Sequence, residues 1–170
     1  MGQKSTKANK KPYHIAREDA GLSREKASEL LGFISASRIE KIENNKARTN
    51  PEEIVAMAEV YKKPSLCNEF CTNECLIGQK YMPHVETSNL AQITLTVLSS
   101  LNSIDKEKSR LIDISSDGEI TADEYKDFVQ IQEQLNQISL GVSSLQLWIQ
   151  QEMANGKIDQ AKLEAARKAL

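Results

Sequence analysis

The sequence of 170 residues contains no apolar run near the ~20 residues that a transmembrane helix needs, and its beginning lacks the apolar stretch of a secretory signal peptide. Its three cysteines are odd in number and closely spaced, unlike the cysteine framework of a small secreted protein. We therefore expect a cytoplasmic protein that has no membrane partner.

Motifs of common catalytic sites are also missing. The sequence has no glycine-rich phosphate loop and no Gly-x-Ser-x-Gly motif. Its two histidines, His14 and His84, do not stand beside an evident nucleophile and acid. The sequence predicts a protein that is not an enzyme, and it indicates no cofactor.

The segment 21–51 has the pattern of two short helices joined by a glycine. Ser23 is placed to cap the first helix, and Gly32, in the left-handed conformation, to end it; Ser35 is placed to cap the second. Apolar residues recur at helical spacing in both: Ala27, Leu30 and Leu31, then Ile39 and Ile42. The outward residues of the second helix are small or basic: Ala36, Ser37, Arg38 and Lys41. Such a pair places its second helix in the major groove of DNA.

A third helix follows directly. Asn50 is its expected N-cap, Pro51 its first residue and Glu53 the partner of Asn50 in a capping box. Its apolar face would consist of Ile54, Val55, Met57, Ala58 and Tyr61.

Residues 17–61 resemble the phage-repressor-type helix-turn-helix regulators, the Cro/cI-like or xenobiotic-response-element family. The shared positions are Leu22-Ser23, Glu29 to Gly32, Ser35, Arg38 to Lys46, Pro51 and Ile54 to Tyr61. Two departures stand out. The interval from Gly32 to Ile39 is one residue longer than usual, and Asn45 replaces a glycine, which is tolerable because asparagine also adopts the left-handed conformation.

The resemblance implies a sequence-specific transcriptional regulator, a repressor that binds double-stranded DNA. It implies DNA contacts at Ser23, Arg24, Lys26, Ser35, Ala36, Ser37, Arg38, Lys41, Lys46 and Arg48. Among these, Arg38 is expected to read guanine through two hydrogen bonds, whereas Lys46 is expected to contact a phosphate.

Charge is unevenly distributed along the chain. Residues 1–63 carry thirteen Lys/Arg and nine Asp/Glu, whereas residues 64–170 carry nine and fifteen. The basic excess lies in the tail 1–11, which either contacts DNA or is merely solvated. Residues 12–63 carry nine basic and nine acidic residues. This balance favours an alternative function, a protein-interaction module that keeps the helix-turn-helix fold but does not bind DNA, such as an antagonist of another regulator.

The C-terminal half predicts two long helices. The first spans about residues 88–112, with Ser88 or Asn89 as N-cap, and the second begins in a capping box at Thr121 and reaches Ala154. The second helix carries a heptad seam of Phe128, Ile131, Leu135, Ile138, Val142, Leu145 and Ile149. We expect the seam from Ile131 to Ile149 to mediate a homodimer; the alternative is a hairpin that folds back onto the N-terminal domain as an intramolecular core. Gly141 marks either a close helix approach or a weak point.

Two clusters of residues have side chains that could bind a metal ion. Cys67, Cys71 and Cys75, with His84, could hold zinc or an iron–sulfur cluster, but their spacing is unusual and packing as buried thiols is favoured. The loop from Asp113 through Asp117 to Glu124 resembles a calcium-binding loop, although a turn and a capping box explain the same residues. We therefore predict no bound metal.

The sequence as a whole predicts an all-α protein with five parts. These are a basic tail (1–11), a helix-turn-helix domain of four to five short helices (12–64) and a cysteine-containing connector (65–87). A long antiparallel helical hairpin or coiled coil (88–154) and a short terminal helix (155–170) complete the chain.

Overall fold

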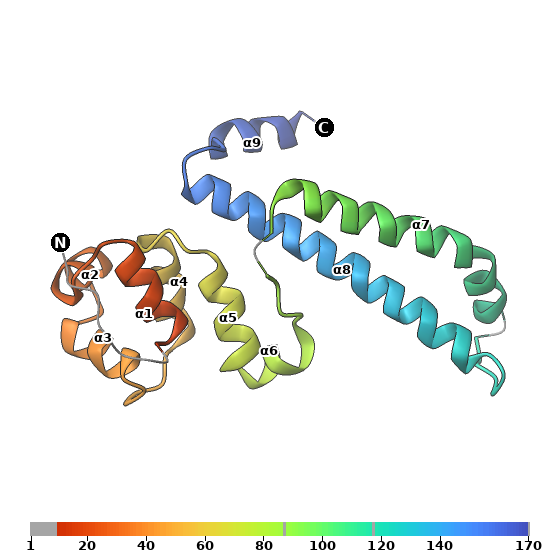
Figure 1. The fold of residues 1–170 in the computed structure, drawn as a ribbon, viewed down its shortest axis with the longest axis horizontal. Helices are drawn as coiled ribbons and strands as arrows, with labels where there is room; N and C mark the ends of the chain where they lie inside the picture. Colours follow the sequence, from red (N-terminus) through yellow and green to blue (C-terminus); the bar gives the residue numbers. More distant parts are fainter. Residues whose placement is uncertain (1–9, 87, 117, 170) are drawn as a thin grey trace. The chain divides into compact units, whose positions relative to one another are not determined.

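The computed structural model describes residues 10–86, 88–116 and 118–169, and within these ranges it contains nine helices and no strand (Figure 1). The helices are α1 (Pro12–Asp19), α2 (Arg24–Leu31), α3 (Ala36–Glu43), α4 (Pro51–Val60), α5 (Ser65–Asn73), α6 (Leu76–Tyr81), α7 (Leu90–Ser115), α8 (Tyr125–Ala154) and α9 (Gln160–Lys168). The predicted all-α class is confirmed.

The chain divides into two compact units. One extends to His84 and includes the segment from Ile149 onward; the other is Val85–Trp148. The division falls within α8, so the last turns of this helix and α9 group with the N-terminal unit rather than with the hairpin predicted at 88–154.

The capping residues of the N-terminal unit act as predicted. Ser23 Oγ accepts the backbone N–H of Lys26 at 3.1 Å, and Ser35 Oγ accepts that of Arg38 at 3.1 Å. Each side chain thereby satisfies one of the backbone donors that the first turn of a helix leaves unpaired. These bonds fix where α2 and α3 begin.

The hydrophobic core of this unit comes from α1 to α5 and the segment before α3. Its most buried aliphatic side chains, exposed by 2% or less, are Ala27, Ile34, Ile39, Ile42, Ile54, Met57 and Leu66. Two residues of the predicted apolar faces are exposed instead: Leu30 by 53% and Val55 by 49%. Leu30 precedes the buried Leu31, and Val55 follows the buried Ile54. Because neighbouring residues are about 100° apart around a helix, each of the two points toward solvent.

Two turns frame α3. Gly32 has the expected positive φ of 75°, but its ψ is −42°, so the left-handed helical conformation predicted for it is wrong. The N–H of Phe33 instead donates to the carbonyl of Leu31 at 2.9 Å, which makes Gly32 the centre of a γ-turn. Asn45, at φ 61°, does adopt the left-handed conformation and ends α3.

Helices α7 and α8 form the predicted antiparallel hairpin (Figure 1). Arg110 Nε donates to Asp127 at 2.6 Å and Gln130 Nε2 to Glu107 at 3.3 Å, so residue numbers fall along one helix as they rise along the other. A Cβ built on Gly141 would lie 2.7 Å from Val97 Cγ2. Gly141 therefore marks a close approach of the two helices.

The heptad seam of α8 is split between two environments. Ile131 is 1% exposed, and Ile138, Leu145 and Ile149 are half-buried. Leu135 and Val142 are 47% and 45% exposed. Within the hairpin, α7 therefore covers only part of the seam.

The ends of the hairpin helices differ from the prediction. Helix α7 continues to Ser115, whereas α8 begins at Tyr125, not at Thr121. The capping residue Glu124 still accepts the backbone N–H of Thr121 at 3.0 Å. Asn89, one of the two predicted caps of α7, accepts the N–H of Gln92 at 2.9 Å.

Candidate nucleic-acid interface

Helix α3 presents its first turn to solvent and buries its opposite face. Ser35 and Ser37 are exposed and Ala36 is half-buried, whereas Ile39 and Ile42 lie in the core with at most 1% exposure. Helix α2 packs against α3. The first turn is thus held at the surface by buried side chains that follow it, which is the geometry of a helix that reads base edges.

A buried ion pair fixes the far end of α3. Arg17 of α1 donates from Nε and Nη2 to the Glu43 carboxylate at 2.5 and 3.0 Å, and from Nη1 to the carbonyl of Leu22 at 2.6 Å. Burial alone would lower the pKa of Arg17, but the hydrogen bonds to Glu43 outweigh it and raise that pKa. Both side chains are less than 8% exposed, so losing one partner would leave a buried charge unpaired.

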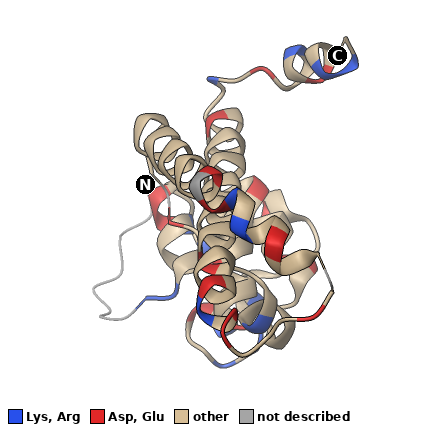
Figure 2. Ribbon diagram, turned by 90° about the vertical axis from the view of Figure 1, so that its right-hand side faces the viewer, with Lys and Arg blue, Asp and Glu red and all other residues tan. Residues whose placement is uncertain are grey.

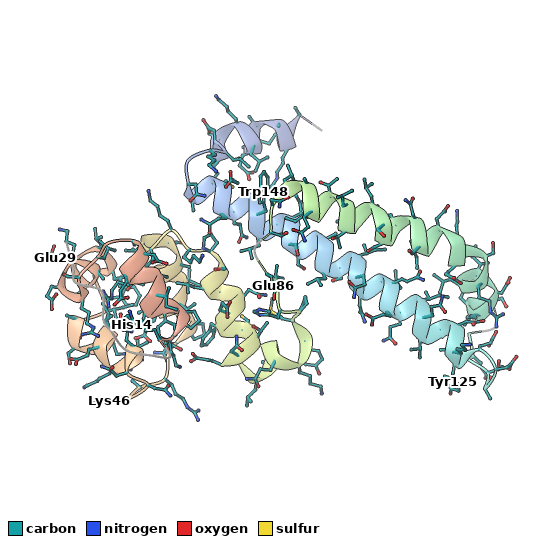
Figure 3. The ribbon with its side chains drawn as sticks, viewed as in Figure 1. His14, Glu29, Lys46, Glu86, Tyr125 and Trp148 are labelled. Carbon is teal, nitrogen blue, oxygen red and sulfur yellow. The ribbon has the colours of Figure 1, made fainter. Side chains whose placement is uncertain are left out.

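His14 joins this network from α1. It lies inside the N-terminal unit (Figure 3), is 1% exposed, and its Nε2 is 3.1 Å from Glu18 Oε1 and 3.8 Å from Glu43 Oε2. The helical spacing of His14 and Glu18 was visible in the sequence, whereas the approach of Glu43 was not. His14 therefore has a structural role: it lies beside the Arg17–Glu43 ion pair that fixes the end of α3.

Two of the predicted DNA contacts already have partners. Arg24 Nε donates to Glu43 Oε2 at 2.8 Å, and Lys26 pairs with Glu29 at 2.7 Å on the exposed side of α2. Exposed pairs of this kind contribute little and exchange readily with water or phosphate. The Arg24 pair is tighter because Glu43 is buried.

Arg38 is also engaged. Its Nε and Nη2 donate to the two carboxylate oxygens of Glu53 on α4 at 2.7 and 2.8 Å, and Nη2 donates to the carbonyl of Arg48 at 2.7 Å. The bonds from Arg38 lower the pKa of Glu53, and those to Glu53 raise the pKa of Arg38. Of the five guanidinium N–H groups, only the two on Nη1 remain available.

Three predicted contacts carry unpaired charge. Lys41, Lys46 and Arg48 are exposed, and no described side chain forms an ion pair with any of them. Lys46 lies at the edge of the N-terminal unit (Figure 3). Lys41 belongs to α3 and the other two to the loop that follows it, so all three surround the end of the recognition helix and suit phosphate contacts.

The end of the basic tail is tied to the domain. Lys10 pairs with Glu18 at 2.5 Å and Lys11 with Glu74 at 2.8 Å. The other two lysines of the tail, Lys4 and Lys7, lie outside the described residues. Basic and acidic residues both occur on the helical ribbon (Figure 2). In this unit Glu18, Glu29, Glu43, Glu53 and Glu74 each form an ion pair with a basic side chain.

Cys67 and Cys71 lie in α5, and Cys75 is the N-cap residue of α6. All are free and half-buried, and the described side chains include no group of three His, Cys, Asp or Glu that could hold an ion. Burial raises the pKa of the Cys67 and Cys71 thiols, which favours their protonated form. His84 instead lies 3.3 Å from the hydroxyl of Thr72.

Of the calcium-loop alternative, the structure describes Asp113 and Glu124. Asp113 belongs to α7, and Glu124 accepts hydrogen bonds from the backbone and hydroxyl of Thr121. Asp117 lies outside the described residues.

The family model described as helix-turn-helix matches residues 14–65. No curated protein and no solved structure matches the chain. The N-terminal domain therefore belongs to the Cro/cI-type helix-turn-helix family, also called the xenobiotic-response-element family. This family places the chain in the general class of DNA-binding helix-turn-helix regulators. No helix over the described residues is long and apolar enough to cross a membrane.

Proposed function

We propose that this chain is a sequence-specific transcriptional repressor that acts as a homodimer and has no catalytic activity. The observation that carries the proposal is the exposed first turn of α3, bordered by Lys41, Lys46 and Arg48, three cations that no described side chain neutralises. Base edges would be read by Ser35, Ala36, Ser37 and Arg38, and the cations would contact phosphates on either side. Repression follows if the operator overlaps a promoter.

The charge balance of the domain does not oppose DNA binding. Glu43 and Glu53 are buried and neutralised by Arg17, Arg24 and Arg38, so these acids present little charge to a ligand. The exposed cations around α3 then dominate the electrostatic potential that a phosphate backbone meets at this surface. This supports DNA binding over the alternative of an interaction module without DNA.

The hairpin supports a two-fold dimer. Its described surface exposes large apolar side chains, each at least 45% accessible, on α7 and α8: Leu95, Leu98, Leu101 and Ile112, then Tyr125, Val129, Leu135 and Val142. Apolar surface on this scale marks an interaction site more often than a free surface. A second copy is the simplest partner, because two headpieces then bind two half-sites one helical turn apart.

The proposal is tested by selecting bound sequences from random duplex with the purified full chain. A two-fold symmetric consensus is expected, with log K falling steeply against log salt and light scattering giving twice the chain mass. Absence of any salt-dependent binding would favour the interaction module. A consensus of a single half-site with a monomeric chain would contradict the dimer alone.

A further inference from the structure

A hollow lies beside the DNA-contact loop, between Asn45–Thr49 and the helices α5 and α6. Its cavity volume is about 690 Å³, and the side chains that matter in its lining are Lys11, Lys46, Arg48, Phe70, Glu74 and Leu76. This volume lies in the range of small-molecule sites, about 300–1,000 Å³. We call it the loop hollow.

The charge of the loop hollow is positive and partly unused. Three cations face a single carboxylate, Glu74, which is already bound by Lys11 Nζ at 2.8 Å, Thr49 Oγ1 at 2.9 Å and Tyr13 Oη at 3.3 Å. Burial would raise the pKa of Glu74, but these bonds outweigh it and lower the pKa, so Glu74 stays ionised. Lys46 and Arg48 are left without a counter-ion among the described side chains.

The lining also has an apolar wall, formed by Phe70 and Leu76. Phe70 packs partly against the domain core, and Leu76, the first residue of α6, is 83% exposed. Helix α6 is held close to α5 because Gly78 has no side chain: a Cβ there would lie 2.1 Å from the carbonyl oxygen of Cys71. An exposed leucine is thereby fixed in the same lining as Lys46 and Arg48.

A phosphate of DNA needs the cations but not this apolar wall. Phe70, Glu74, Leu76 and Lys11 all lie outside residues 14–65, the part that matches the helix-turn-helix family model. The wall is therefore added by this chain to a DNA-contact loop. Its chemistry suits a ligand that has a negative group at one end and an aromatic or alkyl body at the other.

We propose that the loop hollow binds a small amphipathic carboxylate and that this ligand competes with DNA for Lys46 and Arg48. The carboxylate pairs with the two loop cations, and its body lies against Phe70 and Leu76. The competition rests on the proposed function, because it requires the loop to contact DNA. Ligand binding itself does not require it.

The site is tested with 2-naphthoate by two-dimensional amide NMR of the full chain. Saturable shifts are expected at residues 46–49 and 70–76. Leu76→Gln and Arg48→Gln should each weaken binding about tenfold, equivalent to about 1.4 kcal/mol. The matched controls are Ile77→Gln, which alters the 72% exposed neighbour of Leu76 outside the hollow, and Lys63→Gln, which removes an exposed cation elsewhere.

Equal effects of all four variants, or shifts confined to other parts of the chain, would overturn the site. Inorganic phosphate provides a second arm and should bind much more weakly than naphthoate, with no response to Leu76→Gln. Equal binding of phosphate would reduce the hollow to a simple anion site and overturn the proposal.

The third arm is competition with operator DNA. Naphthoate should weaken DNA binding by the unmodified chain and have a much smaller effect on Leu76→Gln, whose cations are intact. Naphthoate binding without any effect on bound DNA would overturn the competition. No DNA binding together with normal naphthoate binding would contradict the proposed function and confirm the ligand site, so the two failures are distinguishable.

Discussion

Arg38 and Glu53 join the recognition helix to the helix that follows it through a pair of parallel hydrogen bonds, 2.7 and 2.8 Å long. Glu53 Oε2 also accepts the backbone N–H of Asn50 at 2.9 Å, so the same carboxylate caps α4. One acid therefore fixes the start of α4 and the side chain of the arginine at the start of α3. This arrangement restricts what Arg38 offers to DNA to the two N–H groups of Nη1.

Removing Arg38 should destabilise the domain. Arg38→Ala leaves the Glu53 side chain, which is 10% exposed, without its main donor, and we expect a loss of about 1–3 kcal/mol of unfolding free energy. Urea denaturation at neutral pH measures it. Lys41→Ala on the exposed side of α3 is the control and should leave the free energy of unfolding nearly unchanged.

The same pair should contribute to acid unfolding. The pKa of Glu53 is lowered below its ordinary value of 4.5, so its stabilisation is complete above that pH and is lost as pH falls through the lower folded-state pKa. The stability difference between the unmodified chain and Arg38→Ala should therefore shrink at acid pH. If this difference in the free energy of unfolding stays constant from neutral pH to about pH 3, the Arg38–Glu53 ion pair is not its cause.

DNA binding should separate the role of Arg38 from that of Lys46. Arg38→Ala should relax the sequence preference, because a base contact discriminates by about 1–3 kcal/mol. Lys46→Ala should weaken binding to specific and random DNA alike and reduce the salt slope by about one. Anisotropy titrations on both kinds of duplex measure this. The same proportional loss on both duplexes for both variants would contradict the two roles.

Local signals explain what could be predicted from the sequence. The caps Ser23 and Ser35 act within three residues of themselves, and Asn45 ends its own helix, so short patterns identify them. The partners of the charged groups are remote: Glu53 is 15 residues from Arg38, and Glu74 is 63 residues from Lys11. No local pattern indicates which acid reaches which base.

The heptad seam shows the same limit. Its period identifies the residues that share a stripe on α8, but not which of them the partner helix covers. Ile131 meets α7 closely enough to be buried, whereas Leu135, four residues later, stays 47% exposed. That difference depends on how the two helices cross, which Gly141 and Val97 help to determine.

Adding one methyl group at Gly141 should destabilise the hairpin. Alanine is the better helix former by about 1 kcal/mol, but its Cβ would lie 2.7 Å from Val97 Cγ2, and the β-branched valine cannot rotate away freely. We expect Gly141→Ala to lower the melting temperature and Val97→Ala added to it to restore much of the loss. Ser139→Ala, at an exposed site of α8, is the control without a clash. Additive effects of the two changes would contradict the contact.

Self-association should depend on the exposed half of the α8 seam. Leu135 and Val142 are nearly half exposed within one chain, so charges placed there should leave the hairpin folded. In a dimer the same positions are buried, and an unpaired carboxylate is costly in apolar surroundings. Leu135→Asp with Val142→Asp should therefore give a folded monomer that binds a two-half-site operator far more weakly.

Light scattering and circular dichroism together decide this prediction. The control is Gln132→Asp with Ser139→Asp, which adds the same charge at the same seven-residue spacing on exposed positions outside the seam, and it should remain dimeric. If the unmodified chain is monomeric at tens of micromolar, the dimer is wrong and DNA is read by a single headpiece. If both double variants dissociate equally, general charge repulsion rather than loss of seam contacts is responsible, and the interface lies elsewhere on the hairpin.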